Sequence, residues 1–147
     1  MSQKLLFTGF TALLMAGAAF AQIPRTPSVA GAKVYIIAPK SGAVVSGPVK
    51  VVMGLSGMGV APAGADFEGT GHHHILIDTA RLADEGMPIP MDDKHRHFGK
   101  GQTETALDLP PGRHTLRLVL ADKNHIPHNP PVMSEVITVT VKGAAKQ

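Results

Sequence analysis

The chain has 147 residues, which predicts a single domain. It contains no cysteine, so disulfides, thiolate zinc sites, iron–sulfur clusters and cysteine nucleophiles are excluded. The net charge is only +3 and aromatic residues make up 4% of the chain, which argues against nucleic-acid binding because both a basic stripe and stacking side chains are missing.

The N-terminal region has the pattern of a secretory signal peptide. Lys4 provides the positive charge, residues 5–18 are apolar or small, and Ala19-Phe20-Ala21 fits a cleavage site. We therefore expect residues 1–21 to be a signal peptide that is cleaved after Ala21. The mature protein would be periplasmic or secreted, with no membrane insertion after cleavage.

The rest of the chain has the pattern of a small β domain. Residues 22–32 predict a flexible lead-in, residues 33–142 the domain, and residues 143–147 a short tail. Short β-branched runs bounded by Gly and Pro predict strands at 34–37, 49–55, 73–78, 95–98, 103–109, 113–120 and 132–141. A helical turn is expected around 80–83, and long loops at 57–71 and 122–131. This pattern predicts an all-β fold, a single immunoglobulin-like antiparallel β-sandwich of about seven strands.

Histidines are the candidate functional residues. Seven of the eight fall into three groups, whereas His114 stands alone in a turn-to-strand pattern and is expected to be structural. Alternate residues of a strand share a face, so two members of each strand group are expected to point the same way. The predicted metal ligands are His72, His74, His95, His97, His125 and His128.

Imidazole is a ligand for copper, zinc, nickel and iron, and copper lies highest in the divalent affinity order. The predicted cofactor is therefore a copper ion, with zinc as the alternative, held by four or fewer of the six histidines. Asp78 and Asp122 are expected to cap turns. Met87 and Met91 carry soft thioethers that suit Cu(I), although we expect them to pack against apolar neighbours.

Four segments resemble the bacterial domain-of-unknown-function 4399 family. They are GHHHILID at 71–78, HRHFGKGQTE at 95–104, LPPGRHTL at 109–116 and DKNHIPH at 122–128. The resemblance extends over roughly residues 60–141. It implies an exported β domain in which these histidines are family features, and it implies no activity.

Three functions fit these observations. The first is a periplasmic metal-binding protein, for copper storage, delivery or tolerance. The second is a non-metal interaction module that binds an envelope protein, with its histidines as a network or pH sensor. The third is a copper or zinc metalloenzyme such as a superoxide dismutase-like protein, whose cysteine pair and histidine order this chain lacks. No serine lies in a nucleophile-elbow pattern, so an enzyme is the less favoured interpretation.

Overall fold

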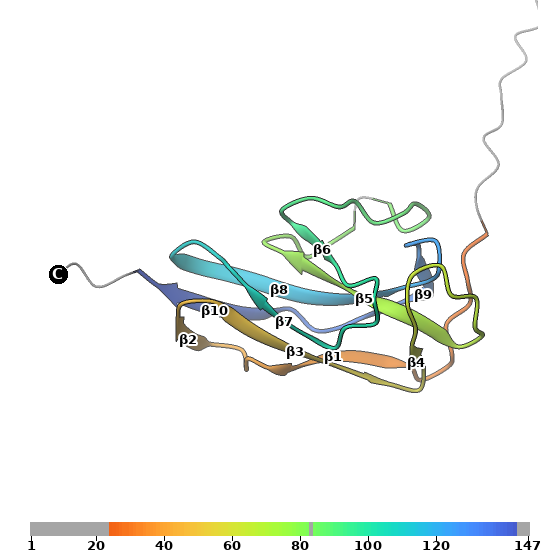
Figure 1. Ribbon diagram of the computed structural model, residues 1–147, viewed down its shortest axis with the longest axis horizontal. Coiled ribbons are helices and arrows are strands. Elements are labelled where there is room, and N and C mark those ends of the chain that lie inside the picture. Colours follow the sequence, from red (N-terminus) through yellow and green to blue (C-terminus); the bar gives the residue numbers. More distant parts are fainter. Residues whose placement is uncertain (1–23, 83, 144–147) are drawn as a thin grey trace, which may run out of the picture.

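The structure is a computed structural model that describes residues 24–82 and 84–143. Within these residues the chain forms ten strands and no helix (Figure 1). The strands are β1 (Lys33–Ala38), β2 (Ala43–Ser46), β3 (Val49–Ser56), β4 (Gly59–Val60), β5 (Thr70–Ile77), β6 (His95–His97), β7 (Glu104–Leu107), β8 (Gly112–Ala121), β9 (Pro127–Met133) and β10 (Ile137–Lys142). The predicted all-β class is confirmed.

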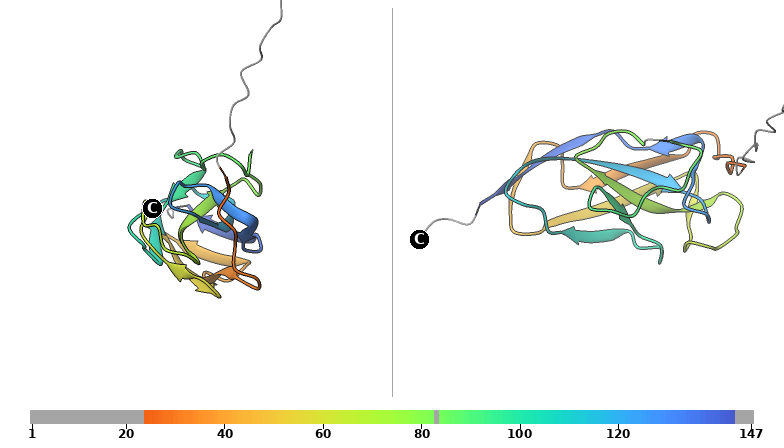
Figure 2. Two further views of the ribbon diagram at one scale, coloured as in Figure 1. Left: turned by 90° about the vertical axis from the view of Figure 1, so that its right-hand side faces the viewer. Right: turned by 90° about the horizontal axis from the view of Figure 1, so that it is seen from above.

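The strands form two sheets that stack as layers, as Figure 2 shows from two sides. One sheet has the order β1-β3-β7. The other has the order β2-β10-β8-β5-β4, with β6 paired to β5 and β9 paired to β8. Only the pairs β2–β10 and β4–β5 are parallel among the strands described. The architecture is the β-sandwich that the sequence predicts, although with ten strands rather than about seven.

Apolar side chains from both sheets fill the space between the layers. Ile75 and Ile77 on the inner face of β5 pack in one cluster with Val49 and Val51 of β3 and Leu118 of β8. None of the five side chains is more than 4% exposed. Burial of each such side chain stabilises the fold by about 1.5–3 kcal/mol.

The outer face of β5 and β8 is covered as well. Leu76, Val119 and Ala121 form a second apolar cluster with Ile89, which belongs to the segment between β5 and β6. Figure 1 shows this segment and β6 lying over the large sheet, on the side away from β1 and β3. As a result every residue of β5 from Gly71 to Ile77 is buried. Polar side chains on this strand are therefore removed from solvent on either face.

The structure divides the last predicted strand in two. β9 ends at Met133 and β10 begins at Ile137. Ser134 causes the break, because its hydroxyl accepts a hydrogen bond from Leu118 N (2.8 Å) and its own N–H donates to Leu118 O (3.0 Å). The structure also has two short strands that were not predicted, β2 of four residues and β4 of two residues. The helical turn expected around 80–83 is absent from residues 80–82, and Ala83 lies outside the described residues.

The N-terminal segment is paired rather than free. Ser28 N donates to Asn129 O (3.0 Å), and Asn129 N donates to Thr26 O (2.9 Å), so part of the predicted lead-in is hydrogen-bonded to β9. The predicted signal peptide, residues 1–21, lies outside the described residues. In 24–82 and 84–143 no helix is long and apolar enough to cross a membrane.

Candidate metal centre

Strand β5 contributes two histidines to the candidate centre, because side chains alternate between the two faces of a strand. Successive residues of a strand point to opposite faces, so His72 and His74 share the outer face and His73 points between the sheets. Pairing with β8 sets His72 opposite Ala121 and His74 opposite Val119. Both imidazoles are fully buried. Strand alternation thus places two neighbouring imidazole rings on one buried face.

β6 adds a third imidazole. His97 pairs directly opposite His74 in the antiparallel ladder, and the two ring centroids lie 5.0 Å apart. The ring of His97 lies against the backbone of Gly99, where a Cβ atom would overlap it. The sequence motif Gly99-Lys100-Gly101 therefore has a definite use, since the missing side chain at its first position leaves room for His97.

The fourth imidazole comes from the turn between β8 and β9. His125 has a φ of 65°, in the left-handed region that residues with a side chain rarely adopt. Its N–H donates to Asp122 O (2.9 Å), and its carbonyl accepts from Ile89 N (2.9 Å). These two backbone bonds fix the turn so that the His125 ring lies 5.0 Å from that of His72, measured between centroids.

The four histidines converge on one point. One ring nitrogen from each of His72, His74, His97 and His125 lies within 4.8 Å of the other three. His72 Nε2 lies 3.0 Å from His74 Nε2 and 3.2 Å from His125 Nδ1. Four nitrogens bound tetrahedrally to zinc at about 2.0–2.1 Å are about 3.3 Å apart. The cluster therefore has the dimensions to hold one ion after small ring movements.

Burial lowers the pKa of three of these rings, those of His72, His74 and His97. Loss of solvent, followed by the repulsion expected from protonated His125 and His97, lowers the pKa of His72 to about 4. Burial and the neighbouring imidazoles, His72 first, lower the pKa of His74 to about 2. Burial, then His125, also lowers the pKa of His97. Neutral imidazole is the form that binds a metal, so near pH 7 no proton has to leave His72 or His74 first.

Hydrogen bonding within the cluster is incomplete. A neutral ring nitrogen offers either one proton or one lone pair, so His72 Nε2 cannot make a normal hydrogen bond to both of its neighbours at once. Nδ1 of His72, Nδ1 of His74 and Nε2 of His97 are buried without a partner among the described residues. Buried polar groups are normally paired, so three unpaired nitrogens on these rings show that the four histidines do not complete a hydrogen-bond network among themselves.

The charge around the cluster also suits a cation. No carboxylate is among the four converging side chains. Asp122, only 2% exposed, is close enough for its charge to raise the pKa of His72 against the larger effects of burial and neighbouring histidines. A buried cation is stabilised by a nearby negative charge, and Asp122 supplies one.

The four histidines differ in burial. His72 and His74 are fully buried, whereas His97 and His125 are partly exposed. The two residues of β5 therefore form the more buried part of the cluster, and His97 and His125 the part nearer to solvent.

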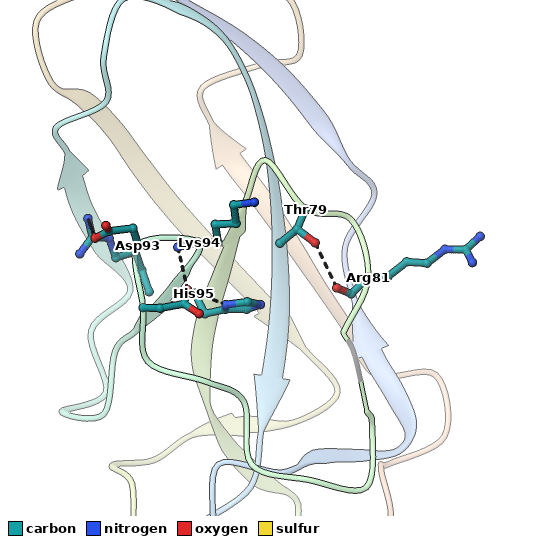
Figure 3. A network of polar contacts seen from close by, with 7 residues as sticks. Thr79, Arg81, Asp93, Lys94 and His95 are labelled. Carbon is teal, nitrogen blue, oxygen red and sulfur yellow. Dashed lines mark hydrogen bonds and ion pairs between the residues drawn. The ribbon is translucent and has the colours of Figure 1, made fainter.

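His95, a predicted ligand, lies outside the cluster. β6 is only three residues long, and its pairing sets His95 opposite Leu76 rather than opposite another histidine. His95 Nδ1 lies 2.7 Å from a carboxylate oxygen of Asp92. Figure 3 shows His95 in this network, beside Asp93 and Lys94. The structure thus gives His95 a local partner in its own loop.

His128, the other predicted ligand outside the cluster, is fully buried at the start of β9. Its ring lies against Gly71, where a Cβ atom would come within 2.8 Å of it. Its nitrogens face backbone oxygens, Nδ1 toward Leu120 (3.3 Å) and Nε2 toward Thr70 (3.2 Å). Both nitrogens are therefore directed at the backbone and not at the four converging rings.

Two further histidines have separate environments. His73 is buried between the sheets, and neither ring nitrogen forms a hydrogen bond of normal geometry with the described residues. Burial lowers the pKa of His73, and the nearby Gln102 backbone opposes this effect. His114 Nδ1 lies 2.8 Å from Asp78, and its Nε2 lies 2.8 Å from Pro110 O. His114 is thus held by hydrogen bonds, in agreement with its expected structural role.

The two loop methionines are exposed, at 55% for Met87 and 75% for Met91, so the expectation that they pack is wrong. Between them Ile89 is buried and bonded through its N–H to His125 O. Asp78 and Asp122 do cap turns as expected. Asp78 accepts from Thr115 N, and Asp122 accepts from the backbone within its own turn.

No curated protein and no solved structure matches the chain. Its sequence does match the family described as Domain of unknown function (DUF4399) over residues 51–142, which include all four converging histidines. The match extends over more than half of the chain, and its range includes the four segments on which the resemblance was based. The protein therefore belongs to the DUF4399 family.

Proposed function

We propose that this is an exported copper-binding protein in which His72, His74, His97 and His125 hold one ion. The observation that carries the proposal is the convergence of four ring nitrogens within 4.8 Å in a buried place. Three supporting features are the lowered pKa values of His72 and His74, the incomplete hydrogen bonding of the cluster and the nearby charge of Asp122.

Copper is favoured over zinc by the donor set. All four candidate donors are imidazole nitrogens, and the chain has no cysteine to supply a thiolate. Among divalent ions copper binds such nitrogen ligands most tightly. Structural zinc sites usually contain cysteine and are closed, whereas this cluster has two partly exposed members. An accessible site fits storage, delivery or tolerance, in which the ion must be taken up and released.

Export is part of the proposal. It is supported by the signal-peptide pattern of residues 1–21. The mature protein would then act in the periplasm or outside the cell, where it would exchange copper with other envelope proteins.

A pH-sensing histidine network is less well supported. A sensor of mild acid needs groups that titrate between about pH 5 and 8. The pKa values of about 4 for His72 and about 2 for His74 keep both rings neutral through that range.

The decisive experiment is metal analysis of the untagged protein isolated from its natural compartment, with copper and zinc measured per chain. We expect close to one copper per chain. One zinc per chain would support the same four-histidine site but identify its metal as zinc. A protein that is isolated empty and also fails to bind added copper or zinc would overturn the proposal.

The chain provides a matched control. His97→Gln removes a cluster histidine, whereas His95→Gln removes a histidine two residues away that faces Asp92. Copper binding should be weakened in the first variant and unchanged in the second. Equal effects of the two substitutions would mean that copper binds to histidine-rich surfaces without using this cluster.

A further inference from the structure

The most distinctive ligand of the proposed centre is His125, because it does not lie on a strand. His72 and His74 are fixed by β5, and His97 is fixed by the pairing of β6 with β5. His125 instead depends on a turn in which its own backbone has positive φ. The position of this ring must therefore be set by whatever holds the turn.

Asp122 holds the turn from within. Its Oδ1 accepts hydrogen bonds from Asn124 N (2.9 Å) and Ile126 N (3.1 Å), on either side of His125. Its carbonyl accepts from His125 N. A carboxylate that bonds both neighbours of one residue restricts the backbone at that residue.

Thr26 holds Asp122 from outside. Its hydroxyl donates to Asp122 Oδ2 (2.7 Å), across 96 positions of sequence. The segment that carries Thr26 is itself fixed, because Arg25 donates to Pro127 O (3.1 Å) and Thr26 O accepts from Asn129 N. Figure 2 shows this first described segment, in orange, at the same end of the molecule as β9.

We propose that Thr26 and Asp122 are positioning residues of the metal centre, through which the N-terminal segment holds His125 in place and controls how firmly the ion is retained. This inference rests on the proposed metal function. It assigns a role to residues that touch no ligand nitrogen. It also makes the centre dependent on a segment outside the 51–142 family match.

Thr26→Val tests the inference, since it removes the hydroxyl and keeps the shape. Copper affinity, measured against a competing chelator, should fall about 10-fold, as for other contacts that orient a ligand. Thr79→Val is the matched control, because its hydroxyl donates only to Arg81 O (3.3 Å) in an exposed loop. Asp122→Asn should act in the same direction as Thr26→Val, since it alters the oxygen that accepts from Thr26.

A double-mutant cycle separates positioning from general stability. In a His125→Ala background, Thr26→Val should have no further effect on copper affinity, because the ligand it positions is gone. An equal loss in both backgrounds, or wild-type affinity for Thr26→Val, would overturn the inference.

A second measurement does not need the metal. In the metal-free protein, Thr26→Val should speed amide hydrogen exchange at Asn124 and Ile126 about 5-fold, the effect of losing one hydrogen bond that holds the turn. Unchanged exchange would overturn the inference even if copper binds. Faster exchange in a protein that binds no metal would instead count against the proposed function alone.

Discussion

His114 and the four-histidine cluster hold imidazole rings in opposite environments. His114 has a partner at each ring nitrogen, Asp78 and Pro110 O. Burial lowers its pKa, but these hydrogen bonds and the Asp78 charge outweigh burial, so the pKa of His114 is raised. In the four-histidine cluster the rings face one another, several nitrogens lack partners, and the pKa values of His72, His74 and His97 are lowered.

The difference shows what each environment stabilises. A ring between a carboxylate and a carbonyl is stabilised as a cation that donates twice. Rings that face only other rings are stabilised as neutral bases, which are suited to share an external cation. Four predictions test this contrast, taken from the largest expected effect to the smallest.

Loss of a buried cluster histidine should have the largest effect. His74→Ala removes the ligand at the centre of the ladder, opposite His97. Copper affinity should fall by more than about 100-fold, beyond the loss typical of a contact that only orients a ligand. Titration against a chelator measures it. His114→Ala, if it folds, should bind copper as tightly as wild type. A comparable loss of copper affinity in His114→Ala would contradict the distinction between His114 and the cluster.

Mild acid should destabilise the metal-free protein through the cluster. Since the pKa of His72 is about 4 in the folded protein and 6.5 in an unstructured peptide, the unfolded chain binds more protons between these values. Stability should therefore fall as pH drops below 6.5, by about 2 kcal/mol at pH 5 from His72. Urea unfolding at several pH values measures the slope. His72→Gln should remove part of it, and an unchanged slope would contradict the neutral state of the ring.

Movement of one ring should weaken the centre without removing a ligand. In Gly99→Ala the new methyl group would overlap His97, so the ring must shift. We expect about a 10-fold loss of copper affinity, judged from other changes that misplace a ligand. Gly143→Ala is the control, because its Cβ atom would make only ordinary contacts. Equal affinities for the two variants would show that His97 is not a ligand.

His114 should show a pH dependence of the opposite sign. Because its folded pKa is raised, its contribution is fully present below the unfolded value of 6.5 and is lost as pH rises through the folded pKa. His114→Gln should cost about 1 kcal/mol at pH 5, a small value because Asp78 is 43% exposed. The cost should shrink as pH rises above neutrality. A cost that grows with pH would mean that His114 is held neutral.

Part of the site is readable from sequence because it depends on local geometry. Alternation along 72–74 predicts that two histidines share a face, and the structure confirms this. The position of His97 depends on register, since only the pairing of β6 with β5 sets it opposite His74. His125 depends on a turn held by contacts distant in sequence. The positions of His97 and His125 therefore cannot be predicted from the spacing of histidines in the sequence alone.

The same reasoning explains the two predicted ligands that the structure places elsewhere. Spacing of two along a strand puts His95 and His97 on one face, but the register of β6 sets only His97 opposite His74 and leaves His95 opposite Leu76. Spacing of three suggested that His128 would join His125, but β9 already begins at Pro127. Prolines within 127–131 argue against a strand in sequence, and β9 is tolerated because it lies at the edge of the sheet.

The placement of β6 has a consequence for the motion of the molecule. β6 pairs only with β5 among the described strands, and it closes the long segment that begins after Ile77. An ion bound to both His74 and His97 would act as a cross-link across the two ends of that segment. Opening of β6 away from the sheet would then require the ion to dissociate first, so proteases that cut transiently opened chains would cleave the loaded protein more slowly than the empty one.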